Sequence, residues 1–158
     1  MLFEELEKTA ASEKFRLQCS ATSVTVSSGP HGIRPTETTV NDGHVGIRVK
    51  TETAHHSDAE ALLLAHEMGH ALTWSMPPVE YRPYLHPTTR PPMDRLQPKE
   101  TRRAIIVVEI RAWVLAWALL QEHGFKDWAV FEKAARQKLG TYVEALGAPD
   151  FLDCRTAL

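Results

Sequence analysis

Cysteine is nearly absent from this sequence of 158 residues, since Cys19 and Cys154 are the only two and lie near opposite ends. Two cysteines are too few for a disulfide-stabilised scaffold, and so sparse a content is typical of a protein of a reducing compartment. The first residues are acidic and amphipathic, unlike a secretory signal or a basic transit peptide. The sequence therefore predicts a cytoplasmic location.

Long apolar runs and an excess of either charge are also missing. No uninterrupted apolar run reaches the roughly 18 residues that would suggest a membrane span, so no membrane partner is expected. The formal net charge is -2, which offers no overall attraction to nucleic acid or to an anionic membrane. Hydrophobic residues make up 43% of the chain. This content and the chain length predict one globular domain spanning residues 1–158.

The N-terminal third of the chain predicts one helix followed by strands. Residues 2–14 have helical periodicity, and residues 15–27 shift toward the alternation of a strand. Residues 38–40 and 45–49 flank the segment Asn41-Asp42-Gly43-His44, which is typical of a hairpin turn. We therefore expect two or three strands in a short antiparallel sheet.

The rest of the chain predicts three helices. Ser57-Asp58-Ala59-Glu60 is a capping box at the start of a helix that continues to Trp74. Seven of the ten prolines fall in residues 75–98, which predicts a long loop of the kind that is more often functional than incidental. A strongly apolar helix is expected at about residues 99–123, and a third helix at about residues 127–146 with an interruption at Gly140.

The candidate metal-binding and catalytic residues are concentrated in the segment His66-Glu67-Met68-Gly69-His70, inside the capped helix. Residues four apart lie on one face of a helix, so both imidazoles can bind one metal ion at about 2.0–2.1 Å. Glu67 lies beside them, where it can deprotonate a water rather than bind the metal. Zinc suits such a donor set. The alternative is a pair of histidines satisfied in the core or at the surface, but burying them without a partner would be costly.

A third ligand is expected from the apolar helix. Glu109 lies on an apolar face there, and Ala112 and Ala116 keep that face shallow enough for another helix to approach. A buried carboxylate must be neutralised, ion-paired or bound to a metal. We predict that Glu109 binds the metal, and the alternative is an ion pair with Arg102 or Arg103. The other candidate ligands lie in the loop or on an expected solvent face: Glu80, His86, Asp94, Glu100 and His123.

The two helices together resemble a known family. His66-Glu67-Met68-Gly69-His70-Ala71-Leu72 is followed 39 residues later by Glu109-Ile110-Arg111-Ala112-Trp113-Val114-Leu115-Ala116. This pair of segments is similar to the gluzincin-type zincin metallopeptidases, and most similar to the small ImmA/IrrE-like group. That group has an H-E-[ILM]-G-H-x-L helix and a later helix that begins E-x-x-A-x-x-x-A.

The resemblance covers about residues 40 to 122 and carries several implications. It implies an α+β, minimal zincin-like domain with an edge strand beside the active-site helix, a zinc ion, and cleavage of protein substrates. It also implies that His66, His70 and Glu109 bind the zinc and that Glu67 is the general base. Trp113 departs from the pattern, because the family often has Asn or Asp there and an indole cannot accept a hydrogen bond from an imidazole.

The sequence thus predicts a zinc-dependent endopeptidase that acts on a protein or peptide substrate through Glu67-assisted attack of metal-bound water. Residues 45–49 are our choice for the edge strand, where Gly46 and Ile47 would bind an extended peptide through their main-chain groups. The oxyanion of the transition state needs a further partner. Candidates for it are Tyr81, Tyr84, His86 and His123.

The alternative function is a catalytically inactive zincin-like module that binds a protein or nucleic-acid partner. Residues 81–103 contain six basic and two acidic side chains, which is the feature that favours this alternative. Glu67 argues against it, because a site that only binds has no use for a base. Nucleic acid is therefore not the expected partner, and the sequence does not indicate an oligomeric state.

Overall fold

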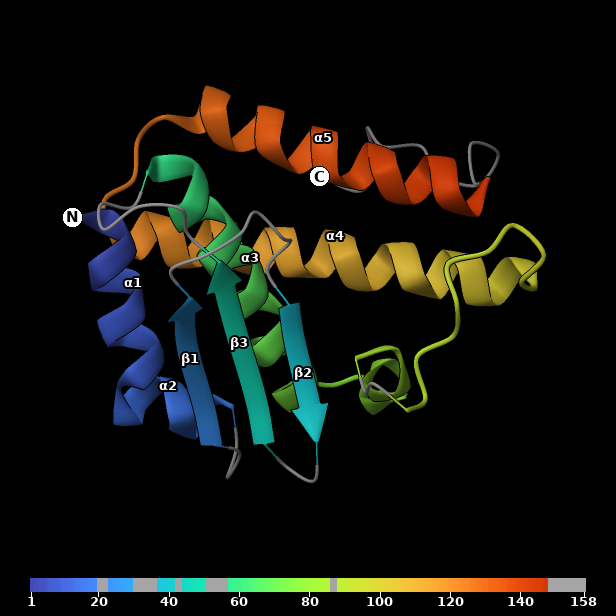
Figure 1. The fold of residues 1–158 in the computed structure, drawn as a ribbon, viewed down its shortest axis with the longest axis horizontal. Coiled ribbons are helices and arrows are strands. Elements are labelled where there is room, and N and C mark those ends of the chain that lie inside the picture. Colours follow the sequence, from blue (N-terminus) through green and yellow to red (C-terminus); the bar gives the residue numbers. More distant parts are fainter. Residues whose placement is uncertain (20–22, 30–36, 42–43, 51–56, 86–87, 148–158) are drawn as a thin grey trace.

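In the computed structural model, described residues are 1–19, 23–29, 37–41, 44–50, 57–85 and 88–147 (Figure 1). Helices account for most of them. The elements are α1 (Leu2–Ala11), α2 (Glu13–Gln18), β1 (Ser23–Gly29), β2 (Glu37–Asn41), β3 (His44–Lys50), α3 (Asp58–Ser75), the 3-10 helix η1 (Val79–Tyr84), α4 (Lys99–Glu122) and α5 (Trp128–Leu146). In Figure 1, α1 lies along β1 at one edge of the sheet, and α5 runs alongside α4.

The sheet differs from the predicted one. Its strand order is β1-β3-β2, with β2 antiparallel to β3 but β1 parallel to it, so that Val24 of β1 and Val40 of β2 both lie opposite Val45. The predicted short antiparallel sheet is therefore not present, and the fold-class prediction of an α+β zincin-like domain built on it is wrong. Alternation in a sequence indicates which side chains share a face of a sheet. It does not indicate the direction of the neighbouring strand, which is why the error arose.

The predicted edge strand is also wrong, because β3 is the central strand. Gly46 has Thr25 on one side and Thr39 on the other, and Ile47 is likewise placed between two strands. The main-chain groups of Gly46 and Ile47 are therefore taken by β1 and β2, and they cannot add a peptide strand. The strand predicted from residue 15 onward is partly helical, since α2 extends to Gln18.

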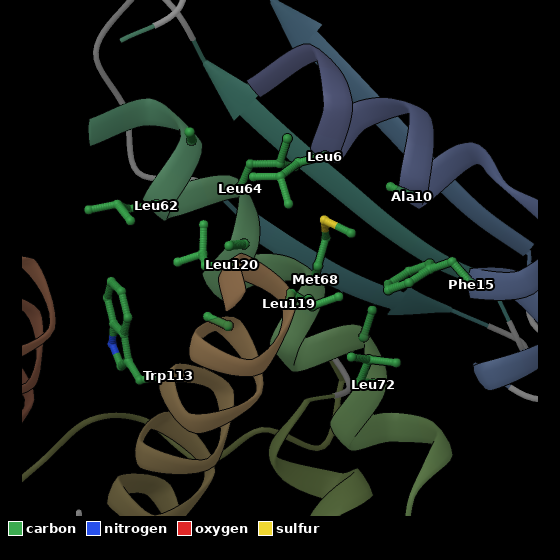
Figure 2. Close-up of a cluster of buried hydrophobic side chains, with 14 of the residues drawn as sticks. Leu6, Ala10, Phe15, Leu62, Leu64, Met68, Leu72, Trp113, Leu119 and Leu120 are labelled. Atoms are coloured by element: carbon green, nitrogen blue, oxygen red, sulfur yellow. The ribbon is translucent and has the colours of Figure 1, made fainter. Parts of the chain in front are cut away.

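Helix α3 begins at the predicted capping box. The Glu60 N–H donates to the Ser57 hydroxyl at 3.3 Å, and the Ser57 N–H donates to the Glu60 carboxylate at 2.8 Å. From residue 61 to residue 73 every α3 residue except Leu63 is buried. Helix α3 contacts α1, α4 and the strands β2 and β3, and Figure 2 shows side chains of α1 and α4 gathered around those of α3, so α3 is the central helix of the described core.

Helix α4 has the apolar character that the sequence predicts. Among the described residues it is the one helix long and apolar enough, by length and composition, to cross a membrane. Half of that apolar stretch is buried within the fold, and α4 packs against both α3 and α5. The core helix of a globular protein has the same properties, so this feature is weak evidence of a membrane.

Candidate metal centre

Helices α3 and α4 approach each other closely at Gly69. A Cβ atom added to Gly69 would lie 2.2 Å from the carbonyl oxygen of Ala112 and 3.0 Å from its Cα. These separations are shorter than any van der Waals contact, so the backbones can come this close only because glycine has no side chain. Ala112 and Ala116 are fully buried on the facing side of α4, which agrees with the shallow face expected from the sequence.

This close crossing places Glu109 of α4 against both histidines of α3. His66 Nε2 lies 3.2 Å from Glu109 Oε2, and His70 Nε2 lies 3.2 Å from Glu109 Oε1. Glu67 Oε1 lies 3.9 Å from His66 Nε2. All four residues are buried, and the most exposed of them is His70 at 7%. The structure therefore brings together the four residues that the sequence predicted for the site.

The spacing of the donor atoms fits a metal ion. A tetrahedral ion with bonds of about 2.0–2.1 Å holds neighbouring donor atoms about 3.3 Å apart, and both nitrogen–oxygen separations to Glu109 are 3.2 Å. His66, Glu67 and His70 also offer one donor atom each within 4.8 Å of one another. The described residues thus contain a buried His66–Glu67–His70 group that can hold a metal ion, with Glu109 in contact with both of its imidazoles.

The electrostatics of the site favour a positive charge. Burial alone would lower the pKa of His70, but the charge of Glu109, a hydrogen bond to it and the charge of Glu67 raise this pKa. Burial alone would raise the pKa of Glu109, but His70 and His66 hold it well below its ordinary value. Two buried carboxylates beside two imidazoles therefore stabilise a positive charge, which either a protonated His70 or a divalent metal ion can supply.

Comparison with protein-family models, with curated proteins and with solved structures finds no match to this chain. The function is therefore inferred from the residues of the site and their geometry.

Trp113 of α4 lies against the ring of His66. The two rings stack, with centroids 4.4 Å apart and planes 30° from parallel. Among the described residues, His66 Nδ1, His70 Nδ1 and Trp113 Nε1 are buried without a hydrogen-bond partner. Where the family pattern often has Asn or Asp at position 113, this chain has a tryptophan that stacks on His66. An aromatic stack orients the imidazole, and it also stabilises a ring that becomes more positive when it binds a metal.

The remaining candidates from the sequence have other contacts. His123 joins α1 to α4, because its Nε2 lies 2.8 Å from the Thr9 hydroxyl and its Nδ1 lies 2.8 Å from the Leu119 carbonyl oxygen. Tyr81 lies beneath the Arg111 guanidinium at 5.8 Å, and Tyr84 packs in an apolar cluster. His86 lies outside the described residues. The acidic candidates Glu80, Asp94 and Glu100 are exposed, as is Arg103.

Helix α5 adds a residue that the sequence did not single out. Tyr142 packs against the cluster of Ile105, Ile106 and Leu146. Burial and the charge of Glu109 raise the pKa of Tyr142. The sequence does contain a signal, because Tyr142 falls four residues before the buried Leu146 on the inner face of α5. That signal indicates a buried face of a helix and does not distinguish a core tyrosine from one beside a metal ligand.

Proposed function

We propose that this chain is a zinc-dependent endopeptidase in which His66, His70 and Glu109 bind the zinc ion and Glu67 is the general base. One observation carries the proposal: both imidazole Nε2 atoms lie 3.2 Å from the two oxygens of one buried carboxylate, beside a second buried carboxylate. Two histidines and a glutamate are a donor set of catalytic zinc sites, which keep one position open. The resemblance to the gluzincin-type motif supports the same assignment.

Glu67 and Glu109 come from different helices and have different contacts with the histidines, so we assign them different roles. Glu109 contacts both imidazoles, whereas Glu67 is next to His66 in the chain and its carboxylate is 3.9 Å from His66 Nε2. When bound, zinc polarises the scissile carbonyl and makes water acidic enough to attack near neutral pH. The Glu67 carboxylate accepts the proton from the attacking water and delivers it to the leaving amine. The burial of all four side chains limits competition from bulk water.

The alternative of a catalytically inactive binding module has less support. Three basic residues of the segment that suggested it are engaged within the fold. Arg82 donates to the carbonyl of Trp74, Arg95 to that of Glu144, and Arg102 to the last carbonyls of α5. These contacts give the arginines a structural role. A protein or peptide substrate in the cytoplasm therefore remains our proposal, and an added peptide strand would use an outer strand of the sheet rather than β3.

The test is metal analysis combined with a proteolysis assay on the full chain. We expect wild type to bind one zinc ion and to cleave an unfolded protein such as reduced casein. Glu67→Gln should keep the zinc and lose activity by at least about 10²-fold, because only the base is removed. Glu109→Ala should lose zinc affinity by about 10-fold or more. Glu100→Gln is the matched control, since Glu100 is an exposed glutamate of the same helix and its loss should change neither quantity.

Two results would overturn the proposal. Wild type that binds no zinc at micromolar concentration would remove the metal centre itself. A Glu67→Gln variant that cleaves as fast as wild type would show that the activity does not use this site. Stoichiometric zinc with no cleavage of any protein or peptide would leave the binding module as the function.

A further inference from the structure

A row of aromatic rings connects helix α5 with the candidate metal centre. The His66 imidazole of α3 stacks on the Trp113 indole of α4, with ring centroids 4.4 Å apart. Trp113 also meets Phe131 of α5, with centroids 5.5 Å apart and planes at 78°. Phe131 in turn meets Trp128 at 5.7 Å and 78°. The residues of the sequence motif lie on two helices, and this row links a third helix to one candidate ligand.

The His66 ring depends on this row because no hydrogen bond within the described part of the chain fixes its second nitrogen. Nε2 of His66 faces Glu109 Oε2 at 3.2 Å, but Nδ1 is buried without a partner among the described residues. A ligating histidine ordinarily donates a hydrogen bond from its second ring nitrogen, and that bond fixes the direction of the ring. Rotation about the last side-chain bond of histidine is otherwise broad. Contact with the indole face therefore restricts the ring instead.

Packing holds the Trp113 indole in its turn. Its Nε1 has no hydrogen-bond partner among the described residues, and both Trp113 and Phe131 are buried. Aromatic rings have a negative face and a positive edge, so two rings at a steep angle attract each other. The 78° contact between Phe131 and Trp113 is of this kind. His66 also meets His70 edge to face at 4.6 Å, so the direction of the first imidazole constrains that of the second.

We propose that Phe131 is a positioning residue for the candidate metal centre, because its ring holds Trp113 against His66 and so couples the docking of α5 to the orientation of a zinc ligand. This inference rests on the metal site that we propose. Phe131 acts through Trp113 and not by binding the metal. An aromatic pair contributes a factor of about 3 to 10 to an equilibrium, so loss of the Phe131 ring should weaken zinc binding by about that factor.

Phe131→Leu tests the inference, because it removes the ring and leaves a buried apolar side chain. The zinc dissociation constant is measured by competition with a chromogenic chelator, and the cobalt-loaded protein gives a visible spectrum that reports ligand geometry. We expect zinc binding about 3- to 10-fold weaker than in wild type and a changed cobalt spectrum. Phe125→Leu is the matched control, since Phe125 meets Trp128 edge-on at 5.3 Å much as Phe131 does. This control should stay within about twofold of wild type.

Nuclear magnetic resonance of the metal-free chain gives a second readout that does not need zinc. Protons that lie over the face of an indole resonate upfield, so the ring protons of His66 report its stack on Trp113. Trp113→Leu should abolish this upfield shift. Phe131→Leu should reduce it, and Phe125→Leu should leave it as in wild type.

A double-mutant cycle separates positioning from general stability. In a Trp113→Leu background the stack is already lost, so Phe131→Leu should change the zinc affinity by less than about twofold. An equal loss in both backgrounds would mean that Phe131 acts only through the stability of α5, and the inference would be wrong. It would also be wrong if Phe131→Leu left the His66 resonances as in wild type. Failure of wild type to bind zinc would instead overturn the proposed function, and the His66 resonances would still decide whether Phe131 holds the ring.

Discussion

Replacing Gly69 by alanine tests how the candidate metal centre is assembled. The added Cβ would lie 2.2 Å from the carbonyl oxygen of Ala112 and 2.9 Å from its carbonyl carbon. Non-bonded heavy atoms of these types are in favourable contact only beyond about 3.3 Å. The two helices must therefore separate by roughly 1 Å at this crossing. Both atoms that the Cβ meets belong to the backbone, so no change of side-chain rotamer can relieve the clash.

The size of the effect follows from two opposing contributions. Overpacking a close contact destabilises by about 1–3 kcal/mol, and alanine in place of glycine within a helix stabilises by about 1 kcal/mol. Because the clash is between backbones, we expect the upper end of the first range and a net loss of about 2 kcal/mol. For a chain of this length the melting temperature would fall by roughly 4–8 °C. Glu109 lies one turn before Ala112, so a shift of about 1 Å would also weaken zinc binding by about 10-fold or more.

Thermal unfolding followed by circular dichroism, together with a zinc competition titration, measures both effects. Gly140→Ala is the matched control, because Gly140 lies within α5 and an added Cβ there meets nothing within 4 Å. That control should gain up to about 1 kcal/mol and leave zinc affinity unchanged. If Gly69→Ala proved as stable as Gly140→Ala and bound zinc as wild type does, the two backbones would not be in contact at Gly69, and the reasoning would fail.

Three further predictions follow from single contacts. Trp113→Phe should abolish most of the change in tryptophan fluorescence on zinc addition, because Trp113 stacks on His66 at 4.4 Å; an equal change in the variant would contradict this. Ser57→Ala should lower the free energy of unfolding in urea by about 1 kcal/mol, because it removes the cap of α3, and an unchanged value would refute the role of the cap. Burial raises the pKa of the Cys19 thiol to about 11, so in a Cys154→Ser background only on the order of 10⁻³ of it is thiolate at pH 8. Alkylation by iodoacetamide should then be slow until denaturant is added, and rapid labelling of the native chain would count against this.

The helix boundaries could be predicted because their signals are local. Ser57 and Glu60 satisfy each other within one turn, and Gly124 has the positive φ of +73° that follows the end of α4. The sheet could not be predicted in the same way. Whether β1 lies parallel or antiparallel to β3 depends on the path of the chain between them, and the alternation of residues within a strand is the same in both cases.

The site residues could be predicted where the type of side chain and its position on a helix face together indicate a metal ligand. His66 and His70 share a face by spacing alone, and Glu109 stands out as a carboxylate on an apolar face. Gly69 and Tyr142 carry no such signal. A glycine within a helix does not indicate which backbone approaches it, and a tyrosine on the inner face of α5 resembles any core aromatic residue. Their places in the fold depend on how α4 packs against α3 and α5, which is a property of tertiary structure.

The burial of α4 explains both its composition and the importance of its buried acidic residue, Glu109. A helix that packs between α3 and α5 must be apolar on most of its surface, and this is the character that makes α4 resemble a membrane-spanning helix. A carboxylate in such a helix is costly to desolvate unless a cation compensates it. Glu109 is 6% exposed and faces two imidazoles rather than an arginine. In the site that we propose, a divalent ion held by these three groups would supply the positive charge that compensates the buried carboxylate.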